Sequence, residues 1–444
     1  MGERGVEPPH LSALPPQGNV YTISPLAQNY GAEERSRTST PVRGQPSEDC
    51  VSTVPPLRLI SHSSGDNINF KISAERGFVC SYPVEVSKLT STHFDLKFHC
   101  IISTCCIISK VKMRNLKIVT FGGGTGHFSL LRGLVEQNQP DLITAVVGTW
   151  DSGGSSGRLR TELGVLPPGD IRQCLLALME DPKQRQVAQK LLDDRLADVA
   201  GPLKGHSFGN LIAARLEHIY KGADRGVEAE RLLFRIRARV LPVSISELNL
   251  MAKLEGGKEL DGESNIDLRR QDSNYSPKEK ILRIYFETNA DPNPDVIQAI
   301  LSADKIIFSA GDLYTSVLPH LLVSGIKEAI AQSKATVILV LNLMTKMGET
   351  DYFKASDYLK AFSYYLGDPN RINYMLVNQN NLDAEVLKVY KKDKQQPVKV
   401  DEETCKKTAP HIKIVKESLA VYHVREHLFR HDSEKLASRI LQLV

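Results

Sequence analysis

The stretch from Asn115 to Gly126 constrains the fold most, because an apolar run ends there abruptly in glycines. The run from Leu116 to Phe121 is short, apolar and partly β-branched, which predicts a buried strand. Ser129–Glu136 follows with leucines at helical spacing, which predicts a helix. A strand, a glycine turn and a helix in this order open a βαβ unit.

The turn itself, Gly122-Gly123-Gly124-Thr125-Gly126, is suited to a phosphate. Glycines let backbone N–H groups approach closely, and a helix N-terminus adds a favourable dipole. The turn lacks the Gly-Lys-Ser/Thr ending of a P-loop. It only approximates the dinucleotide fingerprint, because Ser129 stands in the place of the third glycine. The turn therefore predicts a phosphate-bearing ligand, with a purely structural connection as the alternative.

Composition is ordinary for a soluble chain, and 444 residues allow two or three domains, or one large α/β domain with a tail. The net charge of +4 is too small to indicate a nucleic-acid partner. The longest apolar stretch, 100–111, carries Lys110 and is too short to span a bilayer. Only Cys174 and Cys405 follow Met113, and no Cys-x-x-Cys pair occurs, so we expect a cytoplasmic protein without a zinc site.

Residues 1–112 are expected to be an N-terminal extension. Nine of the 23 prolines lie within about the first 65 residues, without periodicity, which predicts disorder. Strands are plausible at Asn69–Ile72 and Phe94–Cys100, but no helix follows to cover them. Because Met113 directly precedes the first convincing strand, we expect the native protein to begin there, with one domain over 113–444. A small N-terminal β module is the alternative.

From Met113 onward, short apolar strands alternate with helices. The expected strands after the first are Leu142–Val147, Arg239–Val243, Leu248–Leu254, Ile281–Phe286, Lys305–Phe308, Ala335–Leu341 and Asn373–Val377. The expected helices include Ile171–Met179, a segment ending at about Tyr220, Pro294–Leu301, one that follows Ser316 and ends at Gln332, Ser356–Tyr365 and Ser433–Val444. This alternation predicts an α/β fold with a largely parallel sheet covered on both faces.

Polar clusters follow four of these strands, beginning at Gly122, Asp151, Gly311 and Asn342. Ligands of such sheets bind beyond the carboxyl ends of the strands, and all four clusters are expected at that edge. This convergence predicts a ligand site more strongly than any single motif does.

The cluster from Asp151 to Arg160 is expected to be a polar loop. Its serine hydroxyls and glycine N–H groups suit phosphate oxygens, and Arg158 or Arg160 could grip a phosphate bidentately. Asp151 also stands where a dinucleotide fold places its ribose-binding acid. The alternative is a flexible loop with solvated arginines.

Asp151, Asp170 and Asp312 could hold Mg²⁺ beside phosphates through their oxygens. Each could instead be a helix cap or a hydrogen-bonding loop residue, and Asp170 is well placed to cap the 171–179 helix. His206 could be a general acid or base, or could make a hydrogen bond at the start of the next helix. The pair Thr315 and Ser316 could clamp a phosphate or cap a helix.

Assembled in order, these residues resemble the gluconeogenesis factor family (YvcK-like), in the superfamily of 2-phospho-L-lactate transferase (CofD-like). The matching stretches are Phe121-Gly-Gly-Gly-Thr-Gly126, Asp151-Ser-Gly-Gly-Ser-Ser-Gly-Arg-Leu-Arg160, Pro167-Pro-Gly-Asp-Ile-Arg172, Gly205-His-Ser-Phe-Gly-Asn-Leu211, Asp312-Leu-Tyr-Thr-Ser-Val-Leu-Pro319, Gly348-Glu-Thr350 and Arg430-His-Asp-Ser433. Nothing before Met113 matches, and Ser309-Ala310-Gly311 departs from the usual Gly-Pro-Gly.

The resemblance implies a Rossmann-like three-layer α/β/α domain in a cytoplasmic regulatory protein. Such a protein binds a nucleotide sugar such as UDP-N-acetylglucosamine and is linked to cell shape during growth on gluconeogenic carbon, without demonstrated turnover. The alternative is a transferase that moves a phospholactyl group from a guanosine diphosphate donor to the deazaflavin Fo with Mg²⁺. An NAD-dependent oxidoreductase is disfavoured by the imperfect fingerprint. A homo-oligomer is compatible with either function.

Motifs and resemblance together assign a set of residues to ligand and phosphate binding. These are Gly122, Gly123, Gly124, Thr125, Gly126, Asp151, Gly153, Gly154, Ser155, Ser156, Arg158, Asp170, Arg172, His206, Asn210, Asp312, Tyr314, Thr315, Ser316, Tyr390 and Arg430. Tyr390 is expected to stack on a pyrimidine base, and Arg430 to pair with the diphosphate. Alternatively, Tyr390 covers a helix and Arg430 pairs with Asp432.

Overall fold

The computed structural model describes residues 58–64, 67–73, 79–85, 115–379, 384–392, 394–423 and 428–444. The chain divides into two compact units, residues 1–104 and 105–444. The strand predicted at Phe94–Cys100 and the proline-rich residues before Arg58 lie outside the described residues.

The first unit contains a three-stranded antiparallel sheet. Its strands are β1 (Arg58–Ser64), β2 (Asn67–Ser73) and β3 (Val79–Glu85), in the order β1-β2-β3. The strand predicted at Asn69–Ile72 is part of β2.

The second unit is built on a seven-stranded sheet in which every neighbouring pair is parallel. Its strands are β4 (Ile118–Gly122), β5 (Ile143–Val147), β6 (Arg239–Pro242), β10 (Lys305–Phe308), β11 (Thr336–Val340), β12 (Tyr374–Asn378) and β13 (Lys413–Glu417). Their order is β13-β12-β11-β10-β4-β5-β6, the doubly wound Rossmann order with one added strand. The predicted α/β fold is confirmed.

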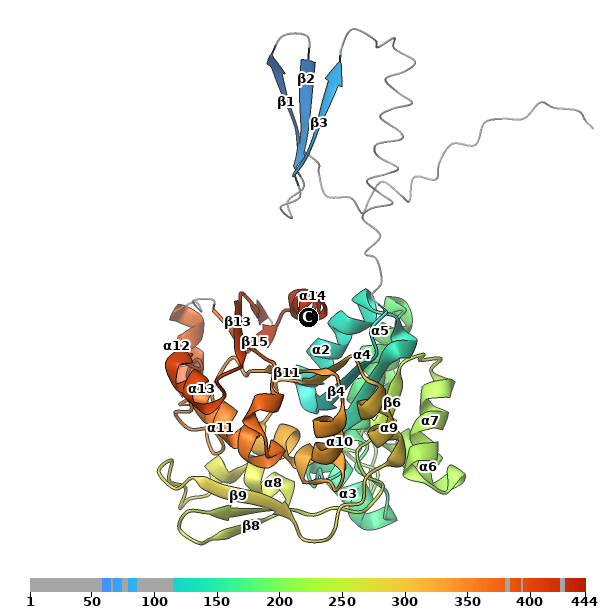
Figure 1. Cartoon of the computed structure of the whole chain (residues 1–444). Coiled ribbons are helices and arrows are strands. Elements are labelled where there is room, and N and C mark those ends of the chain that lie inside the picture. Colours follow the sequence, from blue (N-terminus) through green and yellow to red (C-terminus); the bar gives the residue numbers. More distant parts are fainter. Residues whose placement is uncertain are drawn as a thin grey trace, which may run out of the picture. The chain divides into compact units, whose positions relative to one another are not determined.

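Helices cover both faces of this sheet (Figure 1). They are α2 (Gly124–Gln137), α3 (Gly154–Leu163), α4 (Gly169–Leu178), α5 (Pro182–Leu192), α6 (Phe208–Tyr220), α7 (Ala223–Leu233), α8 (Glu263–Asp267), α9 (Pro294–Ser302), α10 (Ile326–Gln332), α11 (Ala355–Leu366), α12 (Ala384–Lys392), α13 (Glu402–Thr408) and α14 (Ser433–Gln442). Shorter turns are η3 (Pro140–Leu142), η4 (Arg269–Gln271), the π-helical η5 (Leu313–Val317), η6 (Leu318–Leu322) and η7 (Pro369–Arg371).

Two hydrophobic cores, one on each face, make the unit three-layered. Along β4, Val119 and Phe121 join the core that includes residues of α9, α10 and α11. Ile118 joins the other core, with residues of α2, α4 and α14. Because side chains of a strand alternate between faces, this division shows that both faces are buried.

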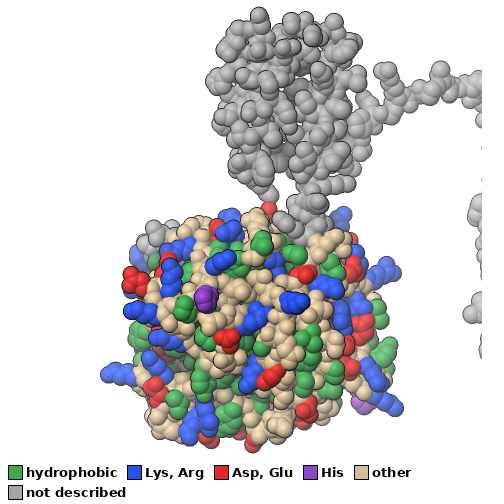
Figure 2. Space-filling view, in the orientation of Figure 1, with side chains coloured by type: hydrophobic (Ala, Val, Ile, Leu, Met, Phe, Trp, Pro, Cys, Tyr) green, Lys and Arg blue, Asp and Glu red, His purple; other side chains and the backbone are tan. Residues whose placement is uncertain are grey.

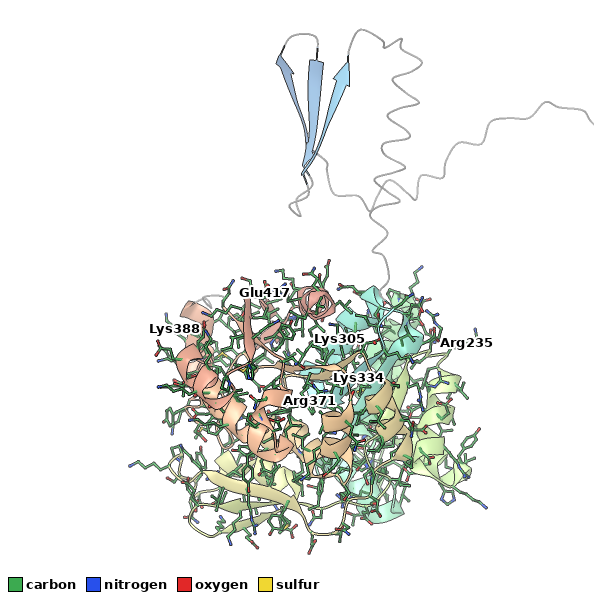
Figure 3. The ribbon with its side chains drawn as sticks, viewed as in Figure 1. Arg235, Lys305, Lys334, Arg371, Lys388 and Glu417 are labelled. Atoms are coloured by element: carbon green, nitrogen blue, oxygen red, sulfur yellow. The ribbon has the colours of Figure 1, made fainter. Side chains whose placement is uncertain are left out.

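Side chains of the sheet also tie the peripheral elements to it. The ammonium of Lys305, labelled in Figure 3, donates to the backbone carbonyl of Leu443 at the end of α14. Arg371, also labelled there, donates to the backbone carbonyls of Ile330 and Ala335, which flank the connection from α10 to β11.

Two smaller antiparallel groups complete the unit. A three-stranded sheet has the order β8-β7-β9, formed by β7 (Leu250–Leu254), β8 (Glu259–Asp261) and β9 (Ile281–Phe286). A hairpin joins β14 (Ala420–His423) and β15 (Leu428–His431). The strands predicted at Leu248–Leu254 and Ile281–Phe286 therefore belong to a separate sheet.

Three element predictions are wrong in detail. Helix α2 begins at Gly124, within the glycine turn, rather than at Ser129. The polar loop expected up to Arg160 is largely the helix α3. The helix expected after Ser316 and up to Gln332 is not continuous, since η6 and α10 follow the end of η5. Gly325, with a left-handed φ of 78°, stands between η6 and α10.

Among the described residues, no helix is both long enough and apolar enough to cross a bilayer. On the face seen in Figure 2, basic and acidic side chains are interspersed rather than gathered into a patch of one sign.

Candidate functional site

The order of the main sheet places a crevice between β4 and β10. These strands are neighbours, and from this pair the chain winds toward opposite edges of the sheet. In doubly wound folds ligands bind at this switch point, beyond the carboxyl ends of the strands. The glycine turn follows β4 there, and Ser309–Asp312 follows β10.

The glycine turn packs tightly at one residue and is open at another. A Cβ built on Gly126 would lie 2.0 Å from the carbonyl oxygen of Ala310, so the two loops approach too closely for any side chain. Gly124 has a left-handed φ of +60°, and a Cβ there would meet no atom within 4 Å. Gly126 is therefore required by packing, whereas Gly124 faces open space.

Three helices begin at one cavity. The N-caps of α2, α3 and α4 are Gly123, Gly153 and Pro168, and none of these three N-cap residues makes a side-chain cap hydrogen bond of its own. The cavity, here called the cradle, has a volume of about 340 Å³. Its lining includes Gly124, Thr125, Asp151, Gly153, Gly154, Ser155, Ser156, Asp170, Arg172, Arg195 and Asn210. Helix N-termini carry partial positive charge, so the three helix starts favour an anion such as a phosphate in the cradle.

Two carboxylates stand among these helix starts. Asp170 Oδ1 accepts a hydrogen bond from the Gly124 backbone N–H at 2.9 Å, and Asp151 Oδ1 accepts one from Gly153 at 2.8 Å. Burial, and to a smaller extent the neighbouring Asp151 and Asp312, raise the pKa of Asp170 to about 6. Burial also raises the pKa of Asp151. The predicted capping role of Asp170 is wrong, because Pro168 is the N-cap of α4 and the Asp170 carboxylate reaches across to α2.

The donor set of the cradle fits Mg²⁺. In each carboxylate, one oxygen accepts a hydrogen bond from a backbone N–H. Carboxylate oxygens beside a phosphate are the usual protein ligands of Mg²⁺. Asp151 and Asp170 would hold the ion, which would neutralise phosphate charge. Asp312 does not join them. Among the described residues its carboxylate instead groups with those of Asp267 and Glu349.

A second cavity, the switch-point cavity, has a volume of about 460 Å³ and shares Gly124 and Thr125 with the cradle. Its lining includes Gly123, Gly126, Asp312, Ser316, Asn342, Lys346, Tyr390, Arg430 and His431. The side chain of Asn342 donates to the backbone carbonyl of Gly311 at 2.8 Å, which fixes the loop after β10.

The two residues predicted at the C-terminal side both line this cavity. The guanidinium of Arg430 donates to Thr125 Oγ1 at 2.9 Å, whereas Asp432 caps α14 by accepting from the Lys435 N–H. Tyr390 is buried and stacks on Phe429 with ring centroids 5.8 Å apart, and its hydroxyl accepts from the Phe429 N–H. One face of the Tyr390 ring is therefore occupied by protein.

Lys346 is the main site residue that the sequence analysis missed. Its ammonium lies 2.8 Å from Asp312 Oδ2 and 2.9 Å from Glu349 Oε1, and it also pairs with Asp267. Burial raises the pKa of Glu349, while Lys346 acts in the opposite direction. The signal was available, since Lys346 follows an apolar strand and stands three residues before Glu349 in the Gly348-Glu-Thr350 motif.

Ser155 lies at the start of α3 in a buried hydrogen-bond network. Its oxygen is 3.2 Å from Asn210 Nδ2 and 3.3 Å from the Ser207 backbone N–H, both donors. The remaining Ser155 hydrogen can point to His206 Nδ1, 3.0 Å away. Burial lowers the pKa of His206, so a neutral ring can accept at Nδ1. His206 therefore stands behind the cradle rather than lining it, and Ser207 is the cap of α6.

Other predicted residues lie apart from the ligand cavities or are tied to protein groups. Arg158 lines neither cavity, and its guanidinium donates to the Lys204 carbonyl. Arg172 lines the cradle but is engaged with Ser207 Oγ and Asp193 Oδ1. The neighbouring Arg195, which the sequence analysis missed, also lines the cradle.

In the π-helical segment, only Ser316 lines the switch-point cavity. Tyr314 and Thr315 are buried, and the Tyr314 N–H and the Thr315 hydroxyl both donate to the Glu349 carboxylate. The clamp role predicted for Thr315 is not supported by this placement, and the N-cap residue of the segment, Asp312, makes no side-chain cap hydrogen bond.

Fold and site define a Rossmann-type α/β protein with a glycine-lined crevice at its switch point. Residues 118–420 match the family model described as 2-phospho-L-lactate transferase CofD. The chain therefore belongs to the CofD family. This match spans β4 to the start of β14. It includes all lining residues of both cavities except those of strand β15, which line the switch-point cavity.

Similar proteins are named gluconeogenesis factors. The chain is 36% identical over 329 residues to the one of Bacillus subtilis, covering 74% of this chain and 98% of that protein. It is 38% identical over 337 residues to the one of Halalkalibacterium halodurans, covering 74% and 97%. A crystal structure of a Bacillus halodurans protein matches with a TM-score of 0.67 at 37% identity, covering 74% of this chain and all of that one.

Proposed function

We propose that this protein binds a nucleoside diphosphate sugar of the UDP-N-acetylglucosamine kind and acts in the cytoplasm as a regulator, without turning its ligand over. Through that binding it would link cell shape to growth on gluconeogenic carbon. The names of the similar proteins support the regulatory part of this proposal.

One observation carries the ligand class: the cradle and the switch-point cavity meet at Gly124 and Thr125. A diphosphate at this junction would face the N-terminus of α2, where Gly124 leaves open space. The cavities of about 340 and 460 Å³ on either side would then take the two ends of the ligand. An elongated molecule with phosphates in its middle fits this arrangement better than a mononucleotide does.

Arg430 and Tyr390 are the candidates for the base end, because both line the switch-point cavity. Arg430 is 2.9 Å from Thr125, so it can reach a phosphate at the junction. Tyr390 lines the same cavity, and a contact of its ring with the base is the role proposed for it.

The second candidate is a Mg²⁺-dependent phospholactyl transferase, as the description of the matching family suggests. The carboxylates of Asp151 and Asp170 in the cradle favour it, since they fit a Mg²⁺ ion beside a diphosphate. In that case a guanosine diphosphate donor and the deazaflavin Fo would be the substrates.

Isothermal titration with UDP-N-acetylglucosamine, UDP, GDP, NAD and Fo separates these functions. We expect UDP-N-acetylglucosamine to bind most tightly; preferential binding of Fo with the GDP-linked donor would favour the transferase. Binding of NAD alone would refute both.

The junction is tested by Gly124→Ala. The new methyl group projects into the space assigned to the diphosphate, so affinity should fall at least about tenfold, equivalent to about 1.4 kcal/mol. Gly164→Ala is the matched control, because Gly164 has a similar φ of +64°, open space around its Cβ and no place in either cavity. Both substitutions carry a left-handed strain of about 1–2 kcal/mol, so stability should change equally. Equal ligand affinity in the two folded variants would remove the diphosphate from Gly124.

A further inference from the structure

A third cavity, here called the tyrosine cavity, lies where the small antiparallel sheet meets α11. Its volume is about 300 Å³, and its lining includes Lys280, Leu282, Tyr314, Phe353, Tyr364 and Tyr365. None of its lining residues belongs to the cradle or to the switch-point cavity. The function proposed above makes no use of it.

The hydroxyl of Tyr314 is the most buried of the tyrosine hydroxyls that line this cavity. The residue is only 6% exposed, yet its hydroxyl makes no hydrogen bond to any described residue and is not sealed away from the cavity. Burial raises the pKa of Tyr314 above its ordinary value, so the hydroxyl stays protonated and can donate. Because this O–H faces the cavity, it is open to a ligand that carries a hydrogen-bond acceptor.

The walls around this hydroxyl are aromatic. Phe353 meets Tyr314 edge to face, with ring centroids 6.5 Å apart. The Tyr365 hydroxyl accepts from the Ile284 N–H at 2.8 Å and keeps its own O–H as a donor. Tyr364 packs its ring against Tyr365 but remains 71% exposed, so it presents aromatic surface at the rim. Such walls favour a planar ring, through offset or edge-to-face contacts.

The charges of the cavity balance, which disfavours a charged ligand. Two carboxylates, Glu255 and Asp357, and two ammonium groups, Lys280 and Lys360, line it. Asp357 is already engaged, since it lies 4.0 Å from Lys360 and accepts from the Lys354 N–H at 2.9 Å. Among the neutral tyrosine donors of the cavity, Tyr314 is the most buried, so we take it as the one that orients a ligand.

We propose that the tyrosine cavity is a second ligand site, which takes a small, uncharged aromatic molecule whose carbonyl oxygen accepts a hydrogen bond from Tyr314.

The π-helical segment η5 connects this site to a spectroscopic reporter. Trp150 is the single tryptophan of the chain, and its indole N–H donates to the Thr315 carbonyl at 2.6 Å. Thr315 directly follows Tyr314, so a ligand that engages Tyr314 changes the surroundings of the indole. Segments of π-helix occur frequently at functional sites. The same segment carries Ser316 into the switch-point cavity, and an effect on nucleotide-sugar affinity, which rests on the proposed function, would follow from this connection.

The test uses benzamide as the probe and the full chain without nucleotide, so its result does not depend on the function proposed above. Saturation-transfer NMR measures binding, and tryptophan fluorescence reports on Trp150. We expect benzamide to bind and to change the fluorescence, and Tyr314→Phe to weaken binding about three- to tenfold. Tyr364→Ala should also weaken it, whereas Tyr220→Ala, at an exposed helical tyrosine outside the cavity, should not.

Matched probes define the ligand class. Cyclohexanecarboxamide keeps the acceptor and lacks the aromatic ring, so it should bind more weakly than benzamide. Absence of benzamide binding, or equal binding by wild type and a folded Tyr314→Phe variant, overturns the site. Tighter binding of benzoate or benzylamine than of benzamide overturns the uncharged class. Binding without any change in fluorescence overturns the connection through η5.

Discussion

Two groups of carboxylates flank the glycine turn, and they differ in what balances their charge. In the cradle, Asp151 and Asp170 face helix N-termini, and neither forms an ion pair within 4 Å among the described residues. At the switch-point cavity, Asp267, Asp312 and Glu349 surround the ammonium of Lys346. The first group is suited to a cation that arrives with a ligand, whereas the second contains its own cation.

This difference separates a binding device from a structural one. Lys346 joins Asp267 at the end of α8 to Asp312 after β10, so it ties the small antiparallel sheet region to the switch point. The cradle carboxylates instead hold only backbone N–H groups at the starts of α2 and α3. Substitutions in the two groups should therefore have opposite effects on stability.

The largest effect is expected for Lys346→Met. Removing the ammonium leaves three carboxylates facing one another, and the Glu349 side chain is fully buried. Loss of one partner of a buried ion pair costs about 3–5 kcal/mol, so the free energy of unfolding measured with urea should fall by about 3 kcal/mol. The loss should shrink as pH falls, because Glu349 can then be protonated.

The control is Lys334→Met, since Lys334 is an exposed lysine outside all three cavities (Figure 3). It should change stability by less than about 0.5 kcal/mol. If both variants lose the same small amount, the Lys346 cluster is not a structural link.

Arg430→Ala should weaken binding of UDP-N-acetylglucosamine at least about tenfold, or about 1.4 kcal/mol. The guanidinium stands beside Thr125, where the two cavities meet, and a charge-assisted contact to phosphate would be lost. Isothermal titration measures this effect, with Arg158→Ala as the control because Arg158 lines neither cavity. The reverse ranking of the two variants would place the phosphates near α3 instead.

Asp170→Asn should stabilise the ligand-free protein, by on the order of 1 kcal/mol at pH 8. The pKa of Asp170 is raised to about 6 in the folded state, from an ordinary value of 3.8. The folded state thus binds more protons between these values, and stability declines as pH rises from about 4 to 6. Above pH 6 the whole penalty is present, and the amide of Asn removes it while still accepting from Gly124.

Thermal unfolding of both proteins at pH 5 and pH 8 checks this sign. The gain from Asn should be larger at pH 8, and a gain that is larger at pH 5 would contradict the assignment to Asp170.

The smallest effect is expected from Mg²⁺ itself. Millimolar Mg²⁺ should raise the melting temperature of the wild type by about 1–3 °C, because an ion that binds only the folded state stabilises it. Asp170→Asn should abolish this shift. If Mg²⁺ raises the melting temperature of Asp170→Asn as much as that of the wild type, the ion does not bind in the cradle. If Mg²⁺ raises the melting temperature only in Lys346→Met, the ion binds among Asp267, Asp312 and Glu349.

The sequence predicts six of the seven strands of the parallel sheet, because these are short apolar runs that need no distant partner to be identified. The runs Leu116–Phe121 and Lys305–Phe308 correspond to β4 and β10, and the polar clusters after them correctly indicate one edge. Strand β13 was not predicted, because lysines and a glutamate interrupt its apolar pattern. Helix α3 was missed because it begins with glycine and serines, which are poor helix formers. Ser155 is held in helical conformation by contacts with His206 and Asn210, which lie more than 50 residues away in the chain.

Local pattern by itself determined the strand–glycine–helix unit, the α/β class and the set of polar loops, since hydrophobic periodicity and glycine act over a few neighbouring residues. Only the tertiary structure decided which charges meet. In the structure, the Asp170 carboxylate accepts from the Gly124 N–H instead of capping its own helix, and Asp312 pairs with Lys346. Tyr314 lines a separate cavity. Electrostatic partners and cavities depend on distances across the fold, and spacing along the chain does not encode those distances.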